Sequence, residues 1–232
     1  MLHKVDIDEA LERVRSWRGV EHVFSDIDPA RTAHVVIDMQ NAFLEEGAEL
    51  EVPVSRDTVD NINRISAVLR AKGGVNIFTR MTMDDDFEMR WSIWLGYFCD
   101  KRRAENVKAI LRAGTHGREL YPAIEVGPDD IVMDKNRYSC FAPDASLLRA
   151  ILTERGIDTL IISGTVTNCC CESTARDAMQ LNYKVLFISD ATSALSDADH
   201  NASLTNMATI FADVMTTGEV IGFIEHPVPV TL

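Results

Sequence analysis

The strongest constraint on the fold is an alternation between short apolar, β-rich runs and stretches with helical spacing. Near-continuous apolar strands that alternate with helices are typical of a parallel sheet covered on both faces. Right-handed crossovers make such a sheet doubly wound. The sequence therefore predicts an α/β fold with three α/β/α layers around a mainly parallel, six-stranded sheet. We expect its strands at 33–39, 75–79, 131–133, 159–163, 185–189 and 213–216, and its main helices at about 57–72, 144–155, 170–181 and 197–211.

The chain divides into a short extension and one large domain. Ile7, Leu11 and Val14 recur at helical spacing within a charged segment, which predicts an amphipathic helical extension over residues 1–30. The remainder, residues 31–232, is long enough to bury one sizeable core and fits one domain better than two.

The charge and the cysteine content narrow the possible partners. A formal net charge of −13 disfavours binding to nucleic acid or to an anionic membrane surface, because both require a basic face. The charged N-terminus and the lack of a long apolar stretch predict a cytoplasmic protein. Five cysteines, three of them adjacent, favour reduced thiols over disulfides. Since no Cys/His cluster has metal-ligand spacing, we expect no metal and no other cofactor.

Polar residues at the ends of the predicted strands carry the candidate chemistry, because ligands of such sheets bind beyond the carboxyl ends of the strands. Cys170 begins a predicted helix, and a helix N-terminus together with a cation such as Lys135 is expected to lower its thiol pKa. Asp38 can take the thiol proton and return it to a leaving amine. Each of these residues alone is more commonly a turn former, a solvated charge or a buried apolar thiol. The combination predicts a nucleophilic hydrolase.

Three motifs add a family resemblance. They are D-M-Q-N-A-F from Asp38, K-x-R-Y-S-x-F from Lys135, and G-x-x-T-N-x-C-x-E-S-T-A-R-D-A from Gly164. Over about residues 32–223 the chain resembles the isochorismatase-like cysteine hydrolase superfamily, whose fold is Rossmann-type. Within it, the second and third motifs look most like ureidoacrylate amidohydrolases.

The resemblance implies a function and a set of catalytic residues. It implies a triad of Asp38, Lys135 and Cys170, a cis peptide bond between Thr165 and Val166, and an oxyanion hole formed by the backbone N–H groups of Val166 and Cys170. Cys169 and Cys171 match positions that are commonly apolar in the family. The implied enzyme is an amidohydrolase that cleaves a C–N bond of a small amide, ureido or carbamoyl compound through a thioester-type acyl-enzyme, releasing ammonia, carbamate or an amine.

Substrate contacts are expected around the triad and in the irregular segment 81–127, which we interpret as an insertion or lid. This segment does not match the ureidoacrylate enzymes clearly, although it usually helps to choose the substrate. The expected contacts follow Asp38, flank Lys135 and Cys170, or lie near the second strand end: Gln40, Asn41, Phe43, Arg80, Trp91, Tyr138, Phe141 and Asn168.

Other interpretations stay open. An isochorismatase- or nicotinamidase-type hydrolase would use the same fold, but the nicotinamidase metal histidines are missing after the second strand. A non-catalytic small-ligand-binding α/β module would want a glycine-rich phosphate loop, and the motif that begins at Asp38 has no glycine. Because relatives are commonly oligomeric, we also expect a homodimer or homotetramer.

Overall fold

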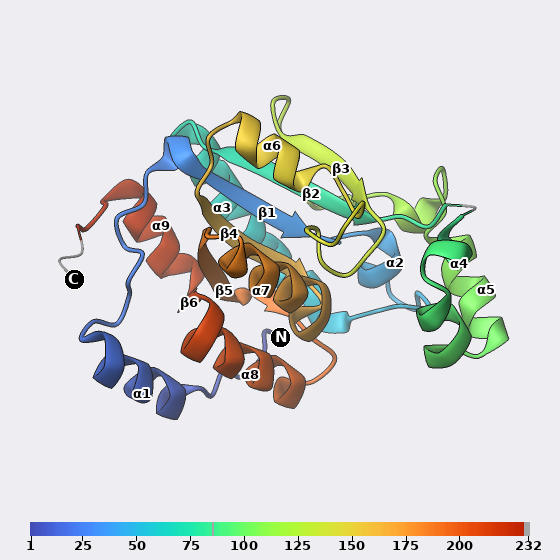
Figure 1. Cartoon of the computed structure of the whole chain (residues 1–232), viewed down its shortest axis with the longest axis horizontal. Coiled ribbons are helices and arrows are strands. Elements are labelled where there is room, and N and C mark those ends of the chain that lie inside the picture. Colours follow the sequence, from blue (N-terminus) through green and yellow to red (C-terminus); the bar gives the residue numbers. More distant parts are fainter. Residues whose placement is uncertain (85, 230–232) are drawn as a thin grey trace.

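The computed structural model describes residues 1–84 and 86–229, and its strands form one parallel sheet (Figure 1). The strand order is β3-β2-β1-β4-β5-β6, so the chain starts near the middle, builds one edge and then returns to build the other. This order confirms the predicted doubly wound α/β fold. The strands are β1 (Thr32–Ile37), β2 (Val75–Met81), β3 (Ile131–Lys135), β4 (Thr159–Thr165), β5 (Lys184–Ser193) and β6 (Asp213–Met215).

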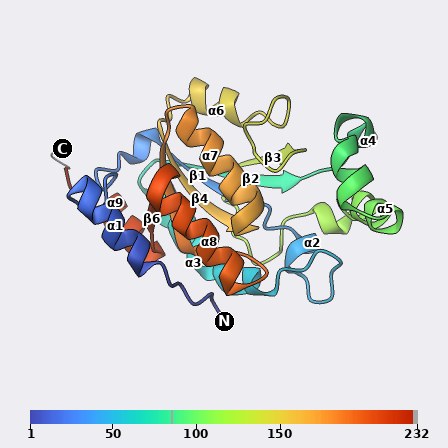
Figure 2. The same cartoon turned by 60° about the horizontal axis from the view of Figure 1, so that its bottom comes forward.

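Helices cover both faces of the sheet. Helices α1, α6, α7 and α8 lie on one face, while α3 and α9 lie on the other (Figure 2), and each face buries its own apolar cluster. The α-helices are α1 (Asp8–Arg18), α2 (Asn41–Leu44), α3 (Val59–Ala71), α4 (Phe87–Arg90), α5 (Lys101–Ile110), α6 (Leu148–Glu154), α7 (Glu172–Gln180), α8 (Asp197–Asn206) and α9 (Thr217–Glu225). Short 3₁₀ or π turns are η1 (Pro29–Arg31), η2 (Pro53–Thr58), η3 (Trp94–Phe98), η4 (His116–Arg118), η5 (Thr167–Cys171) and η6 (Met207–Phe211).

Helix α6 begins later than the sequence predicted. Asp144 has a positive φ of 56°, which is incompatible with a continuing right-handed helix. The Ser146 hydroxyl then accepts a hydrogen bond from the Leu148 N–H at 3.1 Å, so it satisfies one of the donors at the start of the helix.

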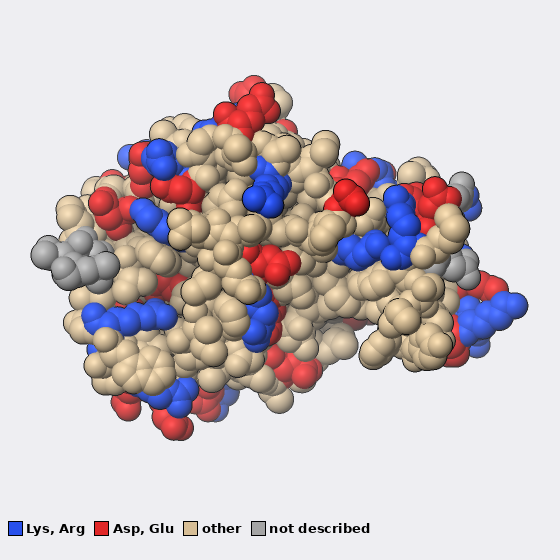
Figure 3. All heavy atoms as spheres, in the orientation of Figure 1, with Lys and Arg blue, Asp and Glu red and all other residues tan. Residues whose placement is uncertain are grey.

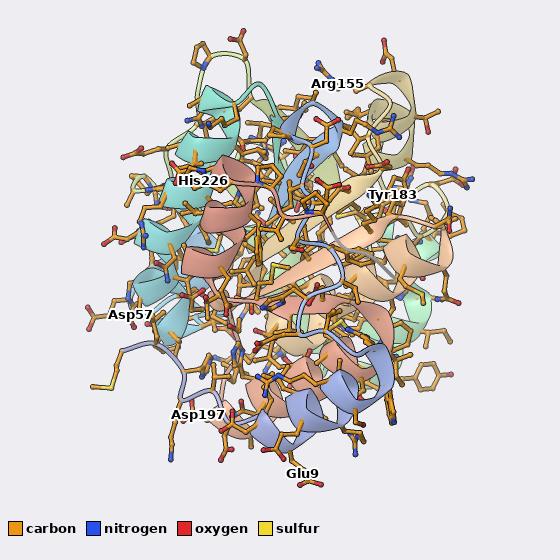
Figure 4. The ribbon with its side chains drawn as sticks, turned by 90° about the vertical axis from the view of Figure 1, so that its left-hand side faces the viewer. Glu9, Asp57, Arg155, Tyr183, Asp197 and His226 are labelled. Carbon is orange, nitrogen blue, oxygen red and sulfur yellow. The ribbon has the colours of Figure 1, made fainter. Side chains whose placement is uncertain are left out.

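The N-terminal extension packs against the same core as the rest of the chain. Ile7, Ala10 and Val14 are buried, and the first two belong to the apolar cluster that α7 and α8 cover. Arg18 donates a hydrogen bond to the Ala208 carbonyl at 2.9 Å. Glu9, by contrast, points outward from α1 (Figure 4). The extension therefore covers part of the apolar core of the domain.

Ahead of α1, His3 joins a chain of contacts that leads to the turn after β4. Its Nδ1 lies 2.7 Å from Asp197 Oδ1, at the start of α8 (Figure 4). The His3 ring stacks on the ring of His200 with centroids 4.3 Å apart. His200 in turn lies 2.9 Å, Nδ1 to Oγ1, from Thr167. The N-terminal segment thus supports the turn in which the candidate nucleophile lies.

Most of segment 81–127 forms a lobe beyond the carboxyl ends of the strands. Helices α4 and α5 project from the body at the right of Figure 1, and the surface is indented between lobe and body (Figure 3). The lobe has its own apolar cluster, which includes Phe87, Leu95 and Val107. This arrangement agrees with the interpretation of the segment as an insertion near the strand ends. None of the helices in the described part of the chain has the length and apolar character needed to span a membrane.

Candidate active site

Three strand ends bring Asp38, Lys135 and Cys170 to one place. Asp38 follows β1, Cys170 follows the neighbouring strand β4, and Lys135 is the last residue of the edge strand β3. Lys135 pairs in register with Met81 of β2, and its side chain reaches across the end of that strand. The Lys135 Nζ lies 2.7 Å from Asp38 Oδ2, and both side chains are almost completely buried.

The close approach of β1 and β4 depends on a glycine. Gly164 has a φ of 110°, a conformation that side chains rarely adopt. A Cβ at this position would overlap the backbone of Ile37, including its carbonyl oxygen. Since Ile37 directly precedes Asp38, Gly164 allows the strands that carry Asp38 and Cys170 to lie side by side.

The Asp38–Lys135 pair is held on both sides. Thr79 donates a hydrogen bond to Asp38 Oδ1 at 3.2 Å, and Lys135 donates one to the carbonyl of Arg137 at 3.0 Å. Burial is the largest single influence and disfavours the charge of Lys135, but Asp38 together with the neighbouring Cys170 and Cys140 outweighs it and raises the pKa of Lys135 above its usual value. Lys135 is therefore held as a buried cation beside Asp38.

The turn that carries Cys170 is π-helical. The peptide bond between Thr165 and Val166 is cis, as expected from the resemblance. The N–H of Cys171 donates to the Val166 carbonyl, five residues back, at 3.2 Å. Cys170 faces the pocket described below, whereas Cys171 is fully buried in the apolar core. Cys169 also lines the pocket, which its match to a commonly apolar family position did not indicate.

The thiol pKa of Cys170 differs from the expectation. Contact with the Cys169 thiol and burial raise it well above its usual value, and the Lys135 ammonium offsets this only in part. The expected lowering was wrong because it did not include the loss of water around a side chain that is 6% exposed. The surroundings of Cys170 thus favour the protonated thiol over the thiolate.

A cavity of about 350 Å³ opens in front of Cys170. The lobe and the loop after α2 form its walls opposite the strand ends. The wall is mainly apolar, and Glu49, Glu51 and Arg103 are its charged members. The apolar and thiol-bearing residues that line it are Phe43, Leu50, Val52, Met81, Met83, Trp91, Trp94, Val107, Leu111, Tyr138, Val166, Cys169, Cys170 and Leu195.

Three of the predicted substrate contacts lie in this cavity wall: Phe43, Trp91 and Tyr138. The Trp91 ring meets Tyr138 edge-on with centroids 4.8 Å apart, and it stacks on Trp94 at 5.7 Å. Burial raises the pKa of the Tyr138 hydroxyl, which keeps this group neutral. These rings form an aromatic part of the cavity wall in which Trp91 and Trp94 are stacked and Tyr138 stands steeply to Trp91.

Gln40 and Asn41 lie outside the cavity wall, in contrast to the expectation. The Gln40 amide donates to the carbonyls of Met81 at 3.0 Å and Arg118 at 2.9 Å, and it accepts from the Met81 N–H at 2.7 Å. Asn41 donates to the carbonyl of His116 at 2.9 Å. Both side chains therefore fasten the lobe to the end of β1, which explains their position directly after Asp38.

Arg80, Phe141 and Asn168 are also outside the cavity wall. Arg80 pairs with Glu119 at 3.2 Å and with Asp134 at 3.1 Å, so it is a structural ion-pair residue. The Phe141 ring packs against Tyr183 with centroids 5.6 Å apart. The side chain of Asn168 is exposed, because the turn after β4 directs Cys170 inward instead.

Much of the cavity wall was not predicted from the sequence. Met83, Trp94, Val107 and Leu111 come from the lobe, where apolar residues are scattered among charges without strand or helix periodicity. The one available signal was the presence of large apolar residues in a highly charged segment. Within residues 1–84 and 86–229, no group of three or more His, Cys, Asp or Glu side chains could hold a metal ion.

Comparison with known proteins shows the family of this chain. The family model described as "Isochorismatase domain" matches residues 32–219. Ureidoacrylate amidohydrolase RutB of Agrobacterium fabrum is 31% identical over 218 residues, which cover 88% of this chain and 95% of that protein. RutB of Variovorax paradoxus is 32% identical over 203 residues, with coverages of 82% and 80%.

Solved structures show the same architecture. A cysteine hydrolase from Pseudomonas syringae pv. phaseolicola superposes with a TM-score of 0.76 at 35% identity, covering 88% of this chain and 96% of that one. N-carbamoylsarcosine amidase from Thermoplasma acidophilum superposes with a TM-score of 0.64 at 27% identity, covering 81% and 96%. The family match spans most of the chain and confirms the resemblance found in the motifs. The chain is a hydrolase that belongs to the isochorismatase family.

Proposed function

We propose that this chain is a cysteine-dependent amidohydrolase that cleaves a C–N bond of a small amide, ureido or carbamoyl compound. One observation supports this above all others. The Asp38–Lys135 ion pair, 2.7 Å long and shielded from water, is close enough to the Cys170 thiol that both charges influence its pKa. A nucleophile, a proton acceptor and a fixed cation therefore meet at the end of a ligand-sized cavity.

In the first half of the reaction, the Cys170 sulfur attacks the substrate carbonyl carbon while its proton passes to Asp38. The backbone N–H groups of Val166 and Cys170 are the proposed donors to the oxyanion. Asp38 then gives the proton to the leaving nitrogen, the C–N bond breaks, and ammonia or an amine departs. The acyl or carbamoyl group remains on sulfur as a thioester-type intermediate.

In the second half, water attacks this intermediate. Asp38 accepts a proton from the water, and the Cys170 thiolate leaves and takes the proton back. Lys135 stays charged throughout because it faces negative charge on Asp38 or on the reacting groups at Cys170 at each stage, and it stabilises that charge. The products are a carboxylic acid from an amide, or a carbamate from a ureido compound that has released ammonia.

The names of the relatives support cleavage of C–N bonds. They are called ureidoacrylate amidohydrolase and N-carbamoylsarcosine amidase. Nicotinamidase-type chemistry receives less support, because the nicotinamidase resemblance would require metal histidines that the sequence lacks after β2.

The test is release of ammonia from a panel of small amides and ureides, measured before and after alkylation by iodoacetamide. Cys170→Ser is expected to lower turnover by a factor of about a thousand or more, since the covalent route is lost. Cys171→Ala is the matched control, because Cys171 is a neighbouring thiol that faces the core. If Cys170→Ser kept more than about a tenth of the wild-type rate, the nucleophile would be another group.

We also propose a homo-oligomer. Met89, Ile93, Tyr97 and Phe98 of the lobe are 61% to 82% exposed, which is unusual for large apolar side chains gathered in one segment. A second copy that covers them would remove this surface from water. Light scattering is expected to give a mass of at least twice 25.9 kDa at micromolar concentration. A monomer mass would contradict this.

A further inference from the structure

We infer that the site accepts an amide or ureide whose non-reacting part is uncharged and apolar, and that it discriminates against substrates with a carboxylate there. This inference rests on the proposed amidohydrolase function and names its substrate class. It separates this chain from relatives named for ureidoacrylate, which is a ureido acid.

The first argument is the chemistry of the wall opposite Cys170. Met83, Trp91, Trp94 and Leu111 present thioether, indole and alkyl groups to the cavity. A carboxylate pushed against such a surface loses its water without gaining a partner, which is strongly unfavourable. A ring or a branched alkyl group, by contrast, is stabilised when it leaves water and packs against this wall.

The second argument concerns the cations around the site. Lys135 is committed to Asp38, and the Arg137 guanidinium donates to the carbonyls of Asn136 and Arg90, each at 2.7 Å. Among the described residues that line the cavity, Arg103 is thus the remaining basic side chain. It is exposed at the rim, where water and salt weaken its attraction for an anionic substrate.

Acidic side chains lie at the same rim. Glu51 is held by Arg56 at 2.7 Å and by the Gly47 N–H at 2.9 Å, and these contacts lower its pKa, so it stays charged. Glu49 is exposed at the mouth. Since Arg56 compensates the charge of Glu51 and Glu49 offsets Arg103, the rim offers an entering carboxylate no net positive charge before it reaches the apolar wall.

The size of the cavity fits a modest substrate. Its volume of about 350 Å³ corresponds to roughly a dozen water molecules at about 30 Å³ each. A phenyl or branched alkyl group attached to an amide fills such a space, whereas a long peptide does not.

The experiment compares matched pairs of substrates that differ in charge but hardly in shape. One pair is 4-methylpentanamide and succinamate, in which a carboxylate replaces the isopropyl group. The other is 4-isopropylphenylurea and 4-carboxyphenylurea, in which a carboxylate again replaces an isopropyl group. The uncharged member of each pair is expected to show a kcat/KM for ammonia release at least about tenfold higher. A carboxylate member that reacted equally well or faster would overturn the inference and leave the amidohydrolase function standing. No turnover of either pair would overturn both.

A charge-introducing variant makes the test independent of the choice of pairs. Met83→Lys places a cation in the apolar wall, and it is expected to shift the preference toward the carboxylate member by tenfold or more. Met179→Lys, on the exposed face of α7, introduces the same charge away from the cavity and is expected to leave the preference unchanged. Equal shifts in the two variants, or an unchanged preference in Met83→Lys, would show that the wall does not decide the charge of the substrate. Circular dichroism spectra of both variants establish that they fold.

Discussion

The two walls of the cavity are built in different ways. On the strand side, each group of the candidate triad is fixed by the sheet: Asp38 by β1, Lys135 by β3 and Cys170 by the turn after β4. On the lobe side, Trp91 and its neighbours contact mainly one another and a small separate cluster. The strand side thus holds reactive groups at fixed positions, while the lobe side determines the shape of the cavity. We expect chemistry to depend on the first wall and substrate choice on the second.

After loss of the nucleophile itself, removing the cation on the strand side is expected to have the largest effect. Lys135→Met leaves Asp38 buried without its partner, and turnover is expected to fall by a factor of about a hundred or more, while Lys135→Arg retains part of the activity because charge survives. Among the influences on the Cys170 pKa, the lowering by Lys135 is stronger than the raising by Asp38. The thiol pKa of Cys170 in Lys135→Met is therefore expected to lie above that of the wild type.

The pH dependence of iodoacetamide alkylation measures this shift. Alkylation requires the thiolate, so its rate rises with pH toward the thiol pKa. The profile of Lys135→Met is expected to move to higher pH, which means slower alkylation at every pH below the new midpoint. A profile that coincides with that of the wild type would show that Lys135 does not set the thiol pKa.

A change on the lobe side is expected to act on binding. Trp91→Ala removes the ring that contacts Tyr138 and Trp94, and kcat/KM is expected to fall about tenfold, mainly through a higher KM. Trp17→Ala is the matched control, because Trp17 is 64% exposed on α1, outside the cavity. If kcat fell as steeply as kcat/KM while the fold was intact, the proposed division between the two walls would have to be abandoned.

Metal removal is expected to have the smallest effect. Steps on the strand side are assigned to a thiol, a carboxylate and an ammonium group, and the described residues offer no cluster for a metal ion. Dialysis against EDTA is expected to leave ammonia release unchanged. Loss of activity that added zinc or manganese restored would contradict the metal-free mechanism.

The sequence was informative where the sheet dictates position. All six strands could be located because each contains consecutive apolar residues, which in the five strands other than the edge strand β3 are almost entirely buried. Strand β5 runs on to Ser193 through polar residues that the apolar pattern does not include. The strand-end rule and the third motif selected Asp38, Lys135 and Cys170, which the structure brings together.

The sequence was less informative where position depends on packing between distant segments. Gln40 and Asn41 follow Asp38 directly, yet they bind backbone groups more than 70 residues away, and adjacency to Asp38 suggested a substrate contact instead. Similarly, Val107 and Leu111 reach the cavity only because the lobe folds back over it. The thiol pKa of Cys170 depends on burial, which a sequence motif does not reveal.

The contacts of His3 bear on what counts as the complete unit of this protein. The match to the family model begins at residue 32, so that model leaves the N-terminal segment outside the shared domain. Physically, the stacking of His3 on His200 and the bond from His200 to Thr167 make that segment part of the support for the turn that carries the nucleophile. A chimaera that exchanged only the domain shared with the family would therefore lose the contacts between this segment and the turn. The family match and the structural support for the turn therefore begin at different residues. For this chain the support begins nearer the N-terminus, at His3.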